Sequence, residues 1–116
     1  MPVDFREKRA FPRIDLKAPI RYQIRGIPSY QRAVSNDISV GGMGFICDNF
    51  IPIETSLMLE INLLTRILKP IGRIVRSYDL PHTNKNRLGV EFIEIDPQEK
   101  MFLNDYINMR RTERTE

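Results

Sequence analysis

The chain has 116 residues, of which 41% are hydrophobic and 28% charged, and its formal net charge is +3. These values are typical of one soluble globular domain with a single hydrophobic core. The one cysteine, Cys47, excludes an internal disulfide, and together with the one histidine it is too little for a zinc site. No apolar run is long enough to span a membrane and no secretion signal is recognisable, so we expect a cytoplasmic protein.

Residues 1–15 form the first predicted segment, a basic arm. Pro2 and Pro12 disfavour a continuous helix there, and apolar residues are few. We therefore predict a flexible N-terminal arm or linker that is not a core element. A folded domain at 16–111 and a polar tail at 112–116 complete the predicted division. Taken alone, the charges of the arm are also explained by a solvated tail.

Six short strands are predicted after the arm. Strict alternation of apolar and polar residues marks the first strand, Ile20–Arg25, and a turn with Gly and Pro follows it. The other five are predicted at about residues 30–37, 43–47, 57–64, 69–78 and 88–92. Short strands separated by turns favour a mainly β fold, either a small antiparallel barrel or a sandwich.

A helix is predicted at the C-terminal end of the domain. Asp96 is a suitable N-cap, Pro97 suits the first helical position and Glu99 suits the third. The apolar residues that follow at helical spacing are Phe102, Leu103, Tyr106, Ile107 and Met109. We expect their face to pack across the barrel.

The stretch from Asp37 to Gly44 contains an acid, a hydroxyl and three glycines. Turn chemistry alone explains it as a plain hairpin or bulge. Because Asp37 and Ser39 are two residues apart, an extended chain would also place their side chains on one face. Gly41 and Gly42 would let a ligand approach the backbone closely. The stretch is therefore either a turn or a small ligand-binding platform.

No arrangement of catalytic residues is recognisable. His82 lies in a predicted turn, no glycine-rich phosphate loop with Lys and Ser or Thr occurs, and no pair of acids has a catalytic motif. The sequence therefore predicts no enzyme, no catalytic residue, no metal site and no cofactor.

Arg9 and Arg13 lie four residues apart at the end of the arm. A guanidinium group can bind phosphate, match the O6 and N7 edge of guanine, or stack on a base. A carboxylate such as that of Asp37 suits the opposite edge of guanine, which is rich in donors. The arm and the platform together would therefore read a guanine nucleotide.

The order of these two elements resembles the PilZ domain pattern, Arg-x-x-x-Arg in an N-terminal arm followed by Asp-x-Ser-x-x-Gly on a small barrel. Here the matching residues are Arg9, Arg13, Asp37, Ser39 and Gly42. The resemblance covers nearly the whole chain, including the terminal helix. It implies a six-stranded antiparallel β-barrel with a C-terminal α-helix that binds the bacterial second messenger cyclic di-GMP.

The resemblance also implies roles for the matching residues. Arg9 and Arg13 would hold guanine and phosphate, while Asp37, Ser39 and Gly42 would line the other guanine contact. Lys8 and Gly41 complete the predicted ligand-binding set. Some members of the family bind one ligand and others a stacked pair, and the position of Lys8 before the first arginine bears on this choice without deciding it.

Three functions are compatible with these features. The first is a cyclic di-GMP receptor that relays the signal to a partner protein through ordering of its arm. The second is a small nucleic-acid-binding barrel, suggested by the positive charge and by Arg21, Arg25 and Arg32, although Asp37 would repel a phosphate backbone. The third is a PilZ-like interaction domain that binds no nucleotide. The two intact motifs favour the first.

Overall fold

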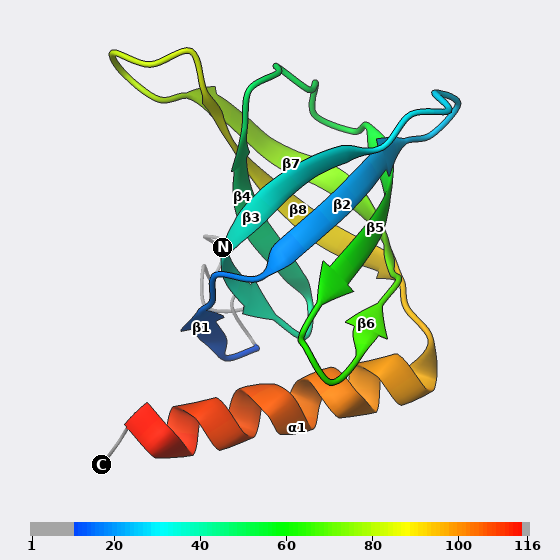
Figure 1. Cartoon of the computed structure of the whole chain (residues 1–116), viewed down its shortest axis with the longest axis vertical. Helices are drawn as coiled ribbons and strands as arrows, with labels where there is room; N and C mark the ends of the chain where they lie inside the picture. The colour runs from blue at the N-terminus through cyan, green and yellow to red at the C-terminus, as the bar shows by residue number, and fades with distance from the viewer. Residues whose placement is uncertain (1–10, 115–116) are drawn as a thin grey trace, which may run out of the picture.

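A closed antiparallel β-barrel forms the body of the molecule (Figure 1). The computed structural model describes residues 11–114. Within them, six strands close the barrel in the order β3–β2–β5–β7–β8–β4, and β4 pairs again with β3. Their bounds are Pro19–Ile24 for β2, Gln31–Ser39 for β3, Gly42–Cys47 for β4, Ser56–Asn62 for β5, Ile71–Asp79 for β7 and Asn86–Glu94 for β8. The predicted six-stranded barrel is confirmed.

The barrel interior is filled by the alternate residues of its strands. In β5, for example, Leu57, Leu59 and Ile61 are buried, while Met58 between them faces outward. Branched and aromatic side chains that point inward from every strand form one continuous core, and this burial is the main favourable term in folding such a chain. The outward positions are therefore free to build a binding surface.

The short strand β1 (Arg13–Asp15) corrects the expectation that residues 1–15 are not a core element. Ile14 is only 2% exposed and pairs with Ile38 of β3. Three residues are too few for an alternating pattern to stand out, so the sequence did not reveal this strand. Residues 1–10, which hold Lys8 and Arg9, lie outside the described residues, and the division between arm and domain stays a prediction.

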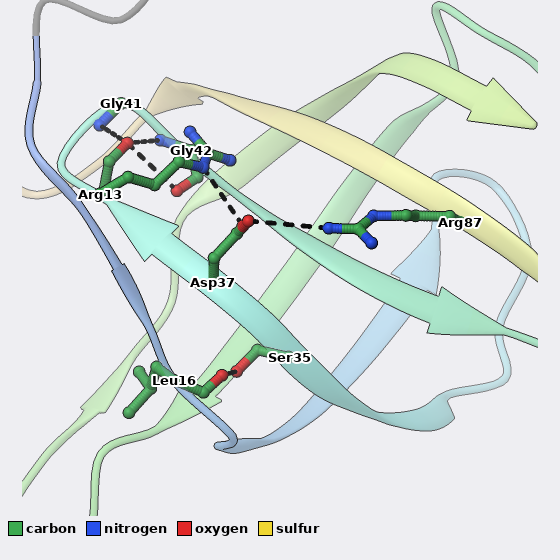
Figure 2. A network of polar contacts seen from close by, with 8 residues as sticks. Arg13, Leu16, Ser35, Asp37, Gly41, Gly42 and Arg87 are labelled. Atoms are coloured by element: carbon green, nitrogen blue, oxygen red, sulfur yellow. Dashed lines mark hydrogen bonds and ion pairs between the residues drawn. The ribbon is translucent and has the colours of Figure 1, made fainter.

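The chain between β1 and β2 is held by one buried serine. Ser35 Oγ accepts a hydrogen bond from Ala18 N at 2.9 Å. It donates a second one to Leu16 O at 2.5 Å, which Figure 2 shows. Both β1 and β2 pair with β3, so this serine ties down the short connection between them. The result is that Arg13 is positioned by the sheet and not by a loose linker.

A second short strand, β6 (Ile67–Leu68), was also not predicted. It pairs with β5, and the turn that joins the two strands lies beside the helix α1 (Pro97–Arg114) (Figure 1). Asp96 caps α1 as predicted, accepting hydrogen bonds from Gln98 N at 2.8 Å and Glu99 N at 3.4 Å. The Glu99 carboxylate accepts a hydrogen bond from Lys69 N at 2.9 Å, which attaches the start of the helix to the β6 turn.

The helix lies across one end of the barrel (Figure 1). Leu103 and Ile107 are buried in the core, and Phe102 and Tyr106 pack against it in part. Met109 is 66% exposed, so its predicted place on the packed face is wrong. Two residues along a helix turn through about 200°, which points Met109 away from the side that Ile107 buries. No helix in the described range 11–114 is long and apolar enough to span a membrane.

Candidate functional site

A groove of about 1090 Å³ runs over the outer surface of the barrel. Its sides come from residues 11–13, the end of β3, β4, β7 and β8, and it reaches Ile95 and Lys100 near the start of α1. Five of the predicted ligand-binding residues line it: Arg13, Asp37, Ser39, Gly41 and Gly42. The structure therefore brings together all the predicted site residues that it describes.

The floor of the groove is made by glycines at outward positions of neighbouring strands. Asp37 of β3 pairs with Gly44 of β4, Gly44 pairs with Gly89 of β8, and Gly89 pairs with Arg76 of β7. Two glycines in the middle of this row leave bare backbone between an acid and an arginine. Since any side chain at these outward positions would rise from the sheet, the glycines hollow the surface.

Gly42 is required because another strand passes close to it. A Cβ atom built on Gly42 would lie 2.1 Å from the carbonyl oxygen of Val90, and one built on Gly44 would lie 3.0 Å from Asp37 Oδ1. Within residues 11–114, Gly26 is the only glycine with a positive φ angle. The glycines of the site therefore serve close approach, not an unusual backbone conformation.

The Asp37 carboxylate lies between two arginines that come from different strands (Figure 2). Arg13 Nε is 3.2 Å from Oδ1, and Arg87 Nη2 is 3.9 Å from Oδ2. Oδ1 is buried, yet it accepts no hydrogen bond of acceptable geometry in the part of the chain that is described. The site thus presents a carboxylate whose charge is compensated by two arginines but whose hydrogen-bonding capacity is not fully used by the described residues.

Ser39 braces the turn that joins β3 and β4. It is 3% exposed, and its Oγ accepts hydrogen bonds from Gly41 N at 3.1 Å and Gly42 N at 3.2 Å. Residues 39 and 42 pair across the strands, so the stretch forms a hairpin, as turn chemistry suggested. The hairpin also lines the groove, which makes the turn and the platform one structure. A direct ligand contact by Ser39 stays a prediction.

Phe11 lies at the rim of the groove. A Cβ atom built on Gly41 would be 2.9 Å from Phe11 Cδ2, so the aromatic ring occupies the space that a side chain would take. The phenylalanine remains 48% exposed. Because Gly41 has no side chain, Phe11, which lies between the two arginines of the first motif in the sequence, can pack against the Asp37–Gly42 motif.

Several lining residues were missed in the sequence. Arg76, Tyr78, Arg87 and Gly89 come from β7 and β8, far along the chain from either motif. The alternation of β8 puts Arg87, Gly89 and Glu91 on one face, which is a usable signal. It does not say that this face lies beside Asp37, because that depends on the pairing of β4 with β8.

The core beside Cys47, at the C-terminal end of β4, contains a thiol and a phenol that are unsuited to catalysis. Burial raises the pKa of the Cys47 thiol, and burial also raises the pKa of the neighbouring Tyr22 phenol. Both side chains therefore stay protonated, and Cys47 Sγ donates to Asn49 O at 2.9 Å. Among residues 11–114, no group of three or more His, Cys, Asp or Glu is arranged to bind a metal ion.

Known structures show the same fold. The inhibitor of motility MotI/DgrA from Bacillus subtilis superposes with a TM-score of 0.79 at 22% identity, covering 89% of this chain and 51% of that chain. The PilZ domain with c-di-GMP of YcgR from Escherichia coli gives 0.69 at 18% identity, covering 89% and 91%. The PlzA protein of Borreliella burgdorferi in complex with c-di-GMP gives 0.58 at 17% identity, covering 92% and 38%.

These structural matches show a likeness of fold. This chain spans about half the length of the motility inhibitor and nearly all of the YcgR domain. No curated protein matches its sequence. The family model described as "PilZ domain" matches residues 7–109, a range that contains both motifs and every strand of the barrel. The chain therefore belongs to the PilZ domain family.

Proposed function

We propose that this chain is a receptor domain for cyclic di-GMP that binds the dinucleotide in the groove and relays the signal to a partner protein. The observation that carries the proposal is the meeting of Arg13 with Asp37, Ser39, Gly41 and Gly42 along one groove. Family membership supports it, as do the similar structures of YcgR and PlzA, which hold c-di-GMP. Binding and relay need no catalytic residue.

Asp37 is suited to the donor edge of guanine. Its buried Oδ1 accepts no hydrogen bond from residues 11–114, and the Watson–Crick edge of guanine offers adjacent N–H donors. The carboxylate side chain as a whole is 22% exposed, so a base could reach it from its open side and donate to it. Asp37 is therefore the residue to which we assign guanine recognition.

The glycine floor and the arginines supply the remaining contacts. The glycine floor at Gly44 and Gly89 carries no side chain that would keep a flat base or a sugar away, and Arg13 offers a planar fork for phosphate or for the Hoogsteen edge of guanine. One exposed ion pair stabilises a complex by roughly 0–1 kcal/mol, whereas micromolar affinity needs about 8 kcal/mol. Several groups must therefore act together, and in our proposal Lys8 and Arg9 join them.

The relay step is assigned to the arm. Repulsion among its cations opposes order, and a ligand with two phosphates removes that repulsion. Phe11, which already lies against Gly41, would be fixed as the preceding residues fold over the groove. The surface offered to a partner would then differ between the free and the bound protein, with the barrel acting as a rigid base.

Isothermal titration calorimetry tests the binding step. Cyclic di-GMP, GTP and a single-stranded DNA oligonucleotide are titrated in parallel at moderate salt. We expect heat and saturation with cyclic di-GMP, and clearly weaker binding of the other two because neither offers its guanine and phosphate groups in the same arrangement.

Two other outcomes would replace the proposal with an alternative. DNA binding at least as tight as that of the dinucleotide, with a steep dependence on salt, would favour the nucleic-acid-binding barrel. No heat with any of the three ligands would favour a protein-interaction domain that binds no nucleotide.

A further inference from the structure

The far side of the groove carries two arginines that belong to neither motif. Arg76 comes from β7 and Arg87 from β8, and both line the groove. In the pairing of these strands Arg87 is opposite Tyr78 and Gly89 is opposite Arg76, so the two arginines are diagonal neighbours. Diagonal neighbours in an antiparallel pair lie roughly 7–8 Å apart, close enough for two long guanidinium side chains to meet on one small anion.

Arg76 is exposed and has no ion-pair partner among residues 11–114. The position that a Cβ of Gly89 would occupy is 3.3 Å from Arg76 Cβ and 3.6 Å from its Cγ and Cδ. The stem of the arginine therefore lies over the bare backbone of Gly89, on the floor of the groove. Among the described residues, no carboxylate forms an ion pair with its charged end.

Arg87 approaches the groove from the other side of Asp37 than Arg13 does (Figure 2). Its 3.9 Å separation from Asp37 Oδ2 is too long for a hydrogen bond, and the arginine side chain is 42% exposed. Such a contact is a weak ion pair that a better acceptor can replace. Arg87 is therefore available to an anion without breaking a strong bond.

The charged side chains that line the groove also favour binding of an anion. Its described lining holds four cationic and two anionic side chains: Arg13, Arg76, Arg87, Lys100, Asp37 and Glu91. Glu91 is already paired with Arg73 at 2.8 Å, outside the groove. The lining thus has an excess of positive charge on both sides of the glycine floor, which suits a ligand with two separated phosphates.

We propose that Arg76 and Arg87 form a second anion-binding wall, which binds one phosphate of the dinucleotide across the glycine floor from Arg13. This inference rests on the proposed function, because it takes cyclic di-GMP as the ligand. In this proposal, the ligand is contacted from two sides of the groove. Arg13 and the arm act on one side of Asp37, and the wall from β7 and β8 acts on the other without depending on the arm.

Calorimetric titration of Arg76→Gln and Arg87→Gln with cyclic di-GMP tests the wall. We expect each variant to bind roughly three- to tenfold more weakly than the parent protein at low salt, and the difference to shrink at high salt, because screening weakens contacts between exposed charges. Arg76→Lys and Arg87→Lys should recover part of the affinity, since lysine keeps the charge.

Arg25→Gln and Arg32→Gln are the matched controls. Both arginines are exposed, neither lines the groove, and each change removes the same charge from the protein. If Arg76→Gln and Arg87→Gln bind like these controls while the parent protein binds well, the wall is ruled out and the proposed function survives. If the parent protein itself does not bind cyclic di-GMP, both the proposed function and the proposed anion-binding wall are contradicted.

Discussion

Asp37 is the residue on which recognition in the groove depends. Arg13 and Arg87 compensate its charge from two sides, and its Oδ1 lies over Gly44, where a Cβ atom would be only 3.0 Å away. A carboxylate that has charge partners but lacks a hydrogen bond is stable in the free protein and still able to accept one from a ligand. The Ser39 hydroxyl, by contrast, already accepts two hydrogen bonds within the turn.

Replacing Asp37 by Asn should weaken binding of cyclic di-GMP by about ten- to a hundredfold, because a bidentate base contact contributes about 1–3 kcal/mol. The amide keeps the size of the side chain but turns one acceptor into a donor, which faces the donor edge of guanine. The measurement is the dissociation constant from calorimetry, with circular dichroism to check the fold. Asp48→Asn is the control, since Asp48 is exposed, does not line the groove and forms an ion pair with Lys85 at 2.6 Å. Equal affinities for the two variants would remove Asp37 from the site.

The elements that build the site differ in how firmly they are held. β3, β4 and β8 belong to the closed barrel, whereas β1 has three residues and, among residues 11–114, pairs with β3 alone. Ser35 compensates by fixing the chain just after β1 through Leu16 and Ala18. The first described strand thus begins at Arg13, and the proposed switch is the stretch before it.

Amide hydrogen exchange with and without cyclic di-GMP tests the switch. We expect protection to rise at residues 8–12 and near residues 37–42, because fixing a residue costs on the order of 1–2 kcal/mol and only the residues that touch the ligand can offset this cost. Residues 13–15 should be protected in both states, since β1 pairs with β3 in the free protein. The helix after Pro97 serves as the internal reference and should not change. Full protection of residues 8–12 before ligand is added would exclude the arm as a switch, but not the binding site.

At the scale of the whole molecule, α1 completes the barrel by covering one of its ends (Figure 1). Leu103 and Ile107 enter the common core with residues of the strands, and Glu99 accepts a hydrogen bond from Lys69 N beside β6. Ile95 and Lys100 also line the groove, so the same helix region closes the core and borders the site. Stability and site geometry are therefore linked through this end of the barrel.

Truncation of the buried helix face should destabilise the whole domain. We expect Leu103→Ala to lower the free energy of unfolding by about 2–5 kcal/mol, because it leaves a cavity in the shared core. Met109→Ala, on the exposed side of the same helix, should change it by less than about 0.5 kcal/mol. Urea denaturation followed by circular dichroism measures both values. Similar losses in the two variants would mean that the helix is packed on a different face.

The sequence by itself determined the features that depend on neighbouring residues. Alternation together with the turn residues between segments predicted the six barrel strands, and Asp96 with Pro97 predicted the start of the helix, because side-chain period, turns and capping are set within a few residues. Of the site residues predicted from the sequence, those that are described, Arg13, Asp37, Ser39, Gly41 and Gly42, all line the groove, and their contact with a ligand stays a prediction.

Only the tertiary structure decided which strands lie side by side. The register Asp37–Gly44–Gly89–Arg76 joins four strands from distant parts of the chain, and no local pattern specifies it. The groove floor and the positions of Arg76 and Arg87 follow from that register. The same holds for β1, which is a strand because β3 offers it an edge, and for Met109, which is exposed because the barrel fixes the side of α1 that is buried. Strand pairing and helix packing depend on contacts between segments that are far apart in the sequence, so they form only when the barrel closes.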